Sequence, residues 1–185
     1  MYVFLDQYSN LIFKNNIINL GVIYRNYESK NRQIELLKIA DACKKKRYKL
    51  YVSNDIKLAL KVKADGIYIP SFNKTKGFNN LGKNNLKILG SAHNQKEIKE
   101  KIRQNCYAIF LAPTFQVKKK DSFVGIYKFN TFTRTNKIKF LALGGINKGN
   151  FSKLKLLNIC GFGGIDMFKK KPAFKRPVFS KNLIF

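Results

Sequence analysis

Short apolar runs alternate with longer, helix-like segments along the whole chain. Eight of these runs are rich in Ile, Val, Leu, Phe and Tyr and are bounded by Gly, Asn, Asp or Pro, a pattern that predicts β-strands. Runs such as AIFLA and FLAL are apolar at every position, which is typical of strands buried on both faces and paired in parallel. The predicted strands are Tyr2–Leu5, Gly21–Arg25, Lys49–Ser53, Gly66–Ile69, Lys87–Gly90, Tyr107–Leu111, Lys139–Leu143 and Gly161–Ile165.

Helical periodicity fills most of the gaps between these strands. It is clearest in residues 31–46, 55–63 and 150–157, and in the segment that starts at Asn94. Asn94 followed by Glu97 predicts a variant of the capping box that begins a helix. The faces expected to point inward are Leu36, Ile39, Ala40 and Cys43 in the first segment, Ile56, Ala59 and Leu60 in the second, Ile98 with Ile102, and Phe151 with Leu154.

Eight strands joined by crossovers that mostly span a dozen or more residues predict an α/β fold, a compact single-domain (β/α)8 TIM barrel. A chain of 185 residues is short for this fold, so some helices must be shortened or missing. Asp6–Leu20 leaves little room for a first helix, and Pro70–Leu86 is too rich in Asn, Gly and Lys for a regular one. An open, doubly wound sheet is the alternative.

Two parts of the chain are distinguished by composition. Residues 1–168 carry the barrel pattern, whereas residues 169–185 form a basic and aromatic tail with two prolines, which we expect to pack in grooves on the barrel.

No apolar run reaches the roughly 18 residues that a membrane span needs, and the first residues do not resemble a signal peptide, so we expect a cytoplasmic protein without a membrane partner. Cys43, Cys106 and Cys160 lack metal-site spacing and are expected to be reduced thiols in or near the core.

The net charge is +27, from 37 Lys and Arg against 10 Asp and Glu. Such an excess is compatible with nucleic acid, an acidic membrane surface or small phosphorylated metabolites as partners. The lysines are spread along the whole chain and Asn is abundant as well, a pattern typical of an AT-rich genome. This distribution favours a compositional origin of the charge over nucleic-acid binding, and small phosphorylated molecules remain the preferred partners.

Catalytic residues of such a barrel lie at the carboxyl ends of its strands. Gly144 and Gly145 follow the seventh predicted strand, and Gly163 and Gly164 lie at the end of the eighth. Backbone N–H groups of these two loops typically bind phosphate, and a side chain there would hold the phosphate away from the amides. Two consecutive glycine pairs therefore predict a phosphate site, although a tight turn would also explain each pair taken alone.

Four segments together resemble the thiamine phosphate synthase and TenI-like family. YVSNDIKLALKVKADGIYI is similar to the family's NDRVDLALAVGADGVHVGQ, ILGSAH to GVSAHT, LAPTFQVKKKD to GPVFPTxTK, and ALGGINKGN to AIGGI with a downstream Asn. Their order and spacing agree from about Tyr2 to Phe168. The resemblance implies a TIM barrel that couples hydroxymethylpyrimidine diphosphate with thiazole phosphate, gives thiamine phosphate and pyrophosphate, and requires Mg²⁺; it also allows a homodimer.

The resemblance implies a role for each matching position. Asp55 matches a magnesium ligand, and Asn54 precedes it as in the family, but Asn73 stands where the family has a second carboxylate. The diphosphate contacts carried over are Arg25, Ser91 and Lys120, and the phosphate loops are Gly144, Gly145, Gly164 and Ile165, with Gly163 beside them.

Other positions depart from the family. Ile23 replaces Gln, Tyr27 replaces Lys, Tyr68 replaces His, Phe72 replaces Glu and Val117 replaces Thr. These departures leave two alternatives to a synthase: a divergent TenI-like barrel that binds thiazole phosphate or another phosphorylated metabolite without coupling it, and a basic RNA-binding protein. The single histidine, His93, follows the fifth predicted strand and is expected to be a structural residue at a helix start, not a catalytic base.

Overall fold

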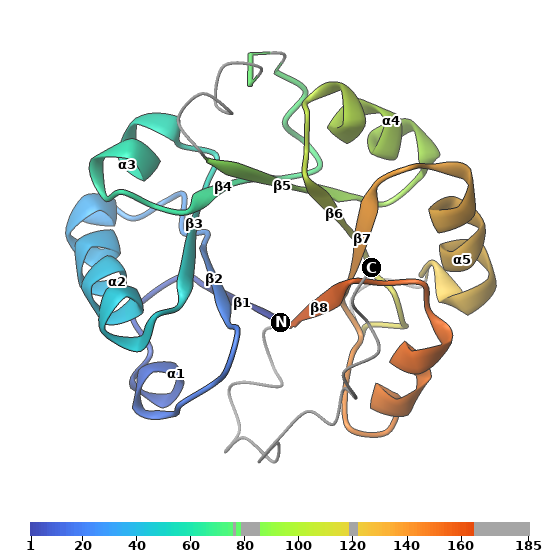
Figure 1. Ribbon diagram of the computed structural model, residues 1–185, viewed down its shortest axis with the longest axis horizontal. Coiled ribbons are helices and arrows are strands. Elements are labelled where there is room, and N and C mark those ends of the chain that lie inside the picture. The colour runs from blue at the N-terminus through green and yellow to red at the C-terminus, as the bar shows by residue number, and fades with distance from the viewer. Residues whose placement is uncertain (76, 79–85, 119–121, 165–185) are drawn as a thin grey trace.

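Eight parallel strands close into a barrel with helices around the outside (Figure 1). The computed structural model describes residues 1–75, 77–78, 86–118 and 122–164. The strands follow one another around the barrel in chain order, and β8 pairs with β1. The predicted TIM barrel is confirmed, and the open sheet is wrong. The strands are β1 (Tyr2–Leu5), β2 (Gly21–Tyr24), β3 (Lys49–Ser53), β4 (Gly66–Ile69), β5 (Lys87–Ala92), β6 (Ala108–Leu111), β7 (Lys139–Leu143) and β8 (Gly161–Gly164).

The helices vary greatly in length. The first one, α1, has only five residues, as the short segment Asp6–Leu20 predicts. Between β4 and β5 the described residues form no helix, but residues 76 and 79–85 lie outside them, so the shortened helix expected there stays a prediction. The apolar pattern did not predict α5, which fills the crossover between β6 and β7. Within the predicted helix at residues 150–157, Phe151–Leu156 form a 3₁₀ helix, η2, in place of an α-helix. The elements are α1 (Asn10–Lys14), α2 (Arg32–Lys46), α3 (Ile56–Lys61), α4 (Gln95–Arg103), α5 (Gly125–Thr135) and η2 (Phe151–Leu156).

Aromatic side chains fill the inside of the barrel. Phe110 makes edge-to-face contacts with Tyr2 and Phe4, at centroid distances of 5.3 and 5.4 Å, and Phe4 contacts Tyr68 at 5.2 Å. Burial raises the pKa of Tyr51 and Tyr68, because a phenolate inside the barrel would lose its hydration. The barrel therefore encloses a packed core and not a channel. A ligand can bind only at one of its two ends. The inner cluster consists of Phe4, Ile23, Tyr51, Tyr68, Leu89, Ala108, Phe110 and Leu141.

Two predicted inward residues lie on the surface. The exposed fractions of Leu60 and Ile102 are 45% and 39%, so both predictions are wrong. In α4 the buried position next to Ile102 belongs to Lys101, whose Nζ donates to the Asn73 backbone oxygen at 2.7 Å and to Gln104 Oε1 at 2.8 Å. Because the segment after β4 presents backbone oxygens to α4, a lysine there finds the hydrogen-bond acceptors that make its burial tolerable.

The three cysteines are free. Cys43 and Cys106 are buried, as expected, but Cys160 is exposed at the start of β8, so its placement near the core is wrong.

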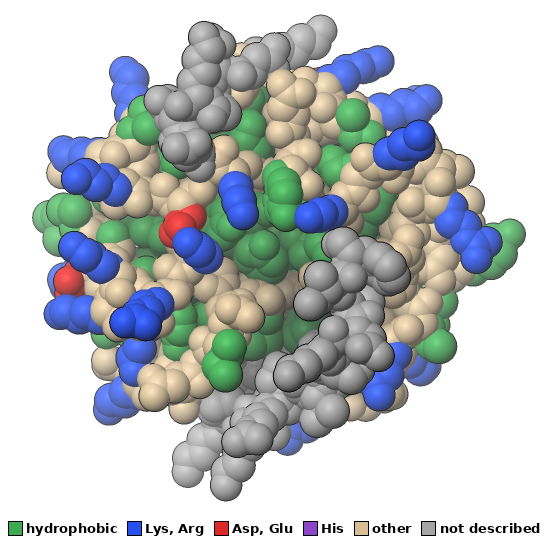
Figure 2. All heavy atoms as spheres, in the orientation of Figure 1, with side chains coloured by type: hydrophobic (Ala, Val, Ile, Leu, Met, Phe, Trp, Pro, Cys, Tyr) green, Lys and Arg blue, Asp and Glu red, His purple; other side chains and the backbone are tan. Residues whose placement is uncertain are grey.

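Figure 2 shows the face of the barrel on which the N-terminus lies. Hydrophobic side chains lie at its centre, and lysine and arginine side chains are scattered around them instead of forming one patch. In the described part of the chain, no helix combines the length and apolar character that a membrane crossing requires.

Candidate active site

The carboxyl ends of β2 to β5 bring a set of polar side chains together around Tyr68. The Tyr68 side chain lies near Ser91 from β5, and its backbone oxygen accepts a bond from Ser53 Oγ of β3 at 3.5 Å. Burial raises the pKa of Tyr68 to about 12, while the Ser91 hydroxyl and the nearby Arg25 charge oppose that rise. At neutral pH this hydroxyl is therefore a neutral hydrogen-bonding group. Ser91 itself is buried and lies inside β5, which extends to Ala92, whereas the sequence pattern predicts that this strand ends at Gly90.

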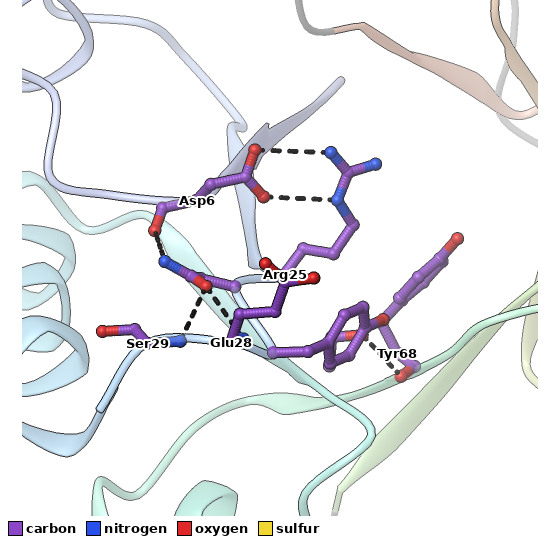
Figure 3. A network of polar contacts seen from close by, with 8 residues as sticks. Asp6, Arg25, Glu28, Ser29 and Tyr68 are labelled. Atoms are coloured by element: carbon purple, nitrogen blue, oxygen red, sulfur yellow. Dashed lines mark hydrogen bonds and ion pairs between the residues drawn. The ribbon is translucent and has the colours of Figure 1, made fainter. Parts of the chain in front are cut away.

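Arg25 follows directly after β2, and its guanidinium points towards Asp6, which follows β1 (Figure 3). Its Nε and Nη2 lie 3.3 and 3.4 Å from the two carboxylate oxygens, and both side chains are well exposed. Long, exposed ion pairs contribute little to stability, so this contact holds the Arg25 guanidinium only weakly. The backbone oxygen of Asp6 also accepts a bond from Asn26, which in turn accepts the N–H groups of Glu28 and Ser29.

Asn54 and Asp55 follow β3 and point into different surroundings. Asn54 has a left-handed backbone with φ of 57°, and its side-chain oxygen accepts a hydrogen bond from Asn73 of the loop after β4. Asp55 is the N-cap of α3, with Oδ1 accepting the Leu58 N–H at 2.9 Å. The other oxygen of Asp55, Oδ2, lies 3.1 Å from Nη1 of Arg32. Both carboxylate oxygens of the predicted magnesium ligand are thus already bound to donors.

Arg32, at the start of α2, is a site residue that the sequence analysis missed. Its Nη2 donates to the Ser53 backbone oxygen, and its guanidinium lies 5.9 and 5.8 Å from the ring centroids of Tyr24 and Tyr27. Tyr27 also hydrogen-bonds to Ser53 through its hydroxyl. An arginine at a helix start carries no sequence signal for these contacts, because they join β2, β3 and α3 only in the folded barrel.

The glycine pair after β7 is built against the loop after β6. Gly144 and Gly145 have φ of 85° and 72°, and a Cβ on Gly145 would lie 2.2 Å from the Phe115 backbone oxygen. The Gly144 oxygen accepts from the Phe115 N–H at 3.1 Å, and the Gly145 oxygen accepts from Asn150 Nδ2 at 2.7 Å. Both glycines are therefore required by backbone conformation and close packing, whether or not a phosphate binds. Asn150, the downstream Asn of the motif, stabilises this loop through its hydrogen bond to the Gly145 oxygen.

The glycines of β8 lie beside this loop, since Leu143 of β7 is in register with Gly163. A Cβ on Gly163 would lie 2.9 Å from Phe110 and 3.3 Å from Phe4, inside the barrel. Gly163 thus leaves room for the aromatic core, and Gly164 pairs with Val3 across the barrel closure. The structure brings the two predicted glycine pairs to neighbouring strand ends. Their use in phosphate binding stays a prediction.

Other predicted residues lie at the edges of the described site. His93 lies between β5 and α4, where its Nδ1 is 2.9 Å from Glu97 Oε2 and Glu97 also accepts the His93 N–H. Asn94 Oδ1 accepts the Glu97 N–H at 3.0 Å, so the capping box is confirmed and His93 belongs to the helix start. Lys120, Ile165, residues 166–168 of the predicted barrel and the predicted tail at 169–185 lie outside the described residues.

Sequence comparisons with known proteins identify one family. The sequence profile described as thiamine monophosphate synthase matches residues 16–167. A thiamine-phosphate synthase of Prochlorococcus marinus strain SARG is 31% identical over 143 residues, which are 74% of this chain and 41% of that protein. Another, from P. marinus subsp. pastoris, is 30% identical and is covered over 47% of its length. The chain therefore spans less than half the length of these relatives.

Solved structures support the fold. A thiamine phosphate pyrophosphorylase from Pyrococcus furiosus superposes with a TM-score of 0.72 at 19% identity, over 92% of this chain and 91% of that one. The structure of FabK from Thermotoga maritima superposes with a TM-score of 0.66 at 15% identity, over 90% of this chain and 58% of that one. At such identities the likeness shows the barrel alone.

Proposed function

Because the chain belongs to the thiamine monophosphate synthase family, we propose that it couples hydroxymethylpyrimidine diphosphate with thiazole phosphate, releasing thiamine phosphate and pyrophosphate. The observation that carries the proposal is the family match over residues 16–167, combined with the polar cluster of Arg25, Ser91 and Tyr68 at the barrel mouth. Its small phosphorylated substrates and a cytoplasmic location are part of the same proposal.

The coupling is dissociative: the diphosphate leaves, and the thiazole nitrogen captures the resulting pyrimidine cation. The protein must hold the leaving group, orient both rings and exclude water. Arg25 supplies a charged donor for the diphosphate in exchange for its weak contact with Asp6. Ser91 and the neutral Tyr68 hydroxyl are hydrogen-bonding groups beside it. The loop of Gly144 and Gly145 follows β7, packs against the loop after β6, and is proposed to bind the thiazole phosphate.

The two residues expected to bind the metal ion, Asp55 and Asn73, do not fit Mg²⁺. This ion prefers oxygen ligands, above all carboxylates. Asp55 is the expected ligand, but its two oxygens are bound to the Leu58 N–H and to Arg32, and a guanidinium 3.1 Å away opposes a dication. The second ligand position holds Asn73, which bonds to Asn54. Among the described residues, no group of three or more His, Cys, Asp and Glu side chains lies together.

This mismatch also favours a second candidate function, in which the barrel binds thiazole phosphate or a similar phosphorylated metabolite without coupling it. The specific observation is Asn73, which stands where the family has its second metal carboxylate and whose side chain donates to Asn54.

One experiment separates the two candidates. The purified chain is incubated with both substrates, and thiamine phosphate is measured by chromatography. Arg25→Gln should lower product formation at least about tenfold, since one charge-assisted contact is lost. Arg103→Gln, which removes an exposed arginine on α4, is the matched control and should have no effect. Binding of thiazole phosphate without product in the wild type would refute the synthase and leave the second candidate.

A further inference from the structure

A guanidinium lies at the place where the family resemblance leads one to expect a metal ion. Arg32 reaches from the start of α2 to the ends of β3 and α3, where it bonds to Asp55 and to the Ser53 backbone oxygen. Its charge is permanent, because the guanidinium is not deprotonated in proteins. A fixed positive charge is thus part of the chain itself at this corner.

The surroundings hold Arg32 in one position. The side chain is 18% exposed and lies beside the rings of Tyr24 and Tyr27, which restrict its movement. Two of its terminal N–H groups are used by Asp55 and Ser53, and its buried Nε has no hydrogen-bond partner among the described residues. Since a guanidinium carries five N–H donors, these contacts leave donor capacity for an anion.

The neighbouring residues offer donors where a metal site would offer anionic oxygens. Asn73 donates its side-chain N–H to Asn54, and each amide keeps at least one further N–H. Arg25 adds a second guanidinium on the adjacent strand end, where it pairs with the exposed Asp6 and lies 5.8 Å from the Phe4 ring centroid. Amides and guanidinium groups are suited to phosphate oxygens, to which arginine binds in bidentate fashion.

We propose that Arg32, together with Arg25, replaces the divalent metal ion, so that this corner binds the diphosphate group of its ligand without Mg²⁺. The inference rests on the proposed function, because it assumes that the barrel mouth receives a phosphorylated ligand. In this arrangement Asp55 is an ion-pair partner of Arg32 that competes with the diphosphate, and no longer a metal ligand.

Binding of inorganic pyrophosphate tests the inference without any need for turnover. Isothermal titration calorimetry at physiological salt compares the chain in EDTA with the chain in excess MgCl₂. The two dissociation constants should agree within about threefold. Arg32→Gln should weaken binding in EDTA at least about tenfold, the loss expected for a charge-assisted contact. Arg103→Gln removes the same charge elsewhere and controls for non-specific attraction to a chain of net charge +27.

Two further variants give opposite results for a metal site and for an arginine site. Asp55→Asn keeps an N-cap residue for α3 and removes the carboxylate that competes for Arg32. It should bind pyrophosphate in EDTA as tightly as the wild type or more tightly, whereas loss of binding would overturn the inference. Asn73→Asp adds the missing carboxylate and should make binding depend on Mg²⁺ by about tenfold or more.

The outcomes also separate this inference from the proposed function. Wild-type binding that requires Mg²⁺ would overturn the arginine site while leaving the synthase proposal intact. Pyrophosphate binding in neither condition, with thiazole phosphate still bound, would overturn the inference and favour the non-coupling candidate. Metal-independent pyrophosphate binding without synthesis of thiamine phosphate would support the inference and refute the synthase.

Discussion

Replacing Gly145 by alanine tests whether packing alone requires the glycine pair after β7. The added Cβ would lie 2.2 Å from the Phe115 oxygen, 2.5 Å from the Phe115 carbonyl carbon and 2.6 Å from the Gln116 oxygen. All three are backbone atoms, so no side-chain rotation relieves the contact. The residue also has a φ of 72°, which disfavours any L-residue with a Cβ.

The magnitude follows from two costs. A left-handed conformation costs an alanine about 1–2 kcal/mol relative to glycine. Displacing the Phe115 backbone weakens the hydrogen bond from its N–H to the Gly144 oxygen, which is worth about 1 kcal/mol, and strains its neighbours. Gly145→Ala should therefore destabilise the fold by roughly 2–4 kcal/mol, which lowers the Tm of a chain this size by roughly 5–15 °C.

The assay is urea and thermal unfolding followed by far-UV circular dichroism. Gly149→Ala, in the same loop, is the control, because its Cβ would meet only the Asn147 side-chain oxygen at 3.3 Å. It should change stability by less than about 0.5 kcal/mol. An equally small change for Gly145→Ala would refute the packing argument and leave close approach of a ligand as the reason for the glycine.

Three other changes test the buried and exposed polar groups. Lys101→Met should cost about 1–3 kcal/mol in urea unfolding, because Gln104 Oε1 loses its donor. Burial lowers the Lys101 pKa, so the unfolded chain binds more protons and the wild type should gain stability relative to this variant as pH rises towards 10.5. Burial raises the Tyr51 pKa, so stability should fall above pH 10, and Tyr51→Phe should reduce that fall. In the native protein, Ellman's reagent should react with one of three thiols, Cys160, and with none after Cys160→Ser; rapid reaction of Cys43 would contradict its burial.

The barrel could be predicted from the sequence because its signal is local. A strand buried on both faces must be apolar at every position, as Phe140 to Leu143 are, and a helix start is marked by a cap such as Asn94 with Glu97. The inner face of a helix was predicted less well. Ile102 and Lys101 are neighbours in sequence, and their exchanged places depend on backbone oxygens from Asn73, 28 residues away.

The candidate site likewise has features that the sequence determined and others that depend on the tertiary structure. The sequence by itself determined which residues lie at or just after the end of each strand, and hence that Arg25, Asn54, Ser91 and the glycines lie near one end of the barrel. Only the tertiary structure decided what each of them touches. Asp55 looks like a metal ligand in the sequence, but folding places the Arg32 guanidinium against it. The physical reason is that a charge acts through space on whichever group the fold places within a few ångströms, whatever their separation along the chain.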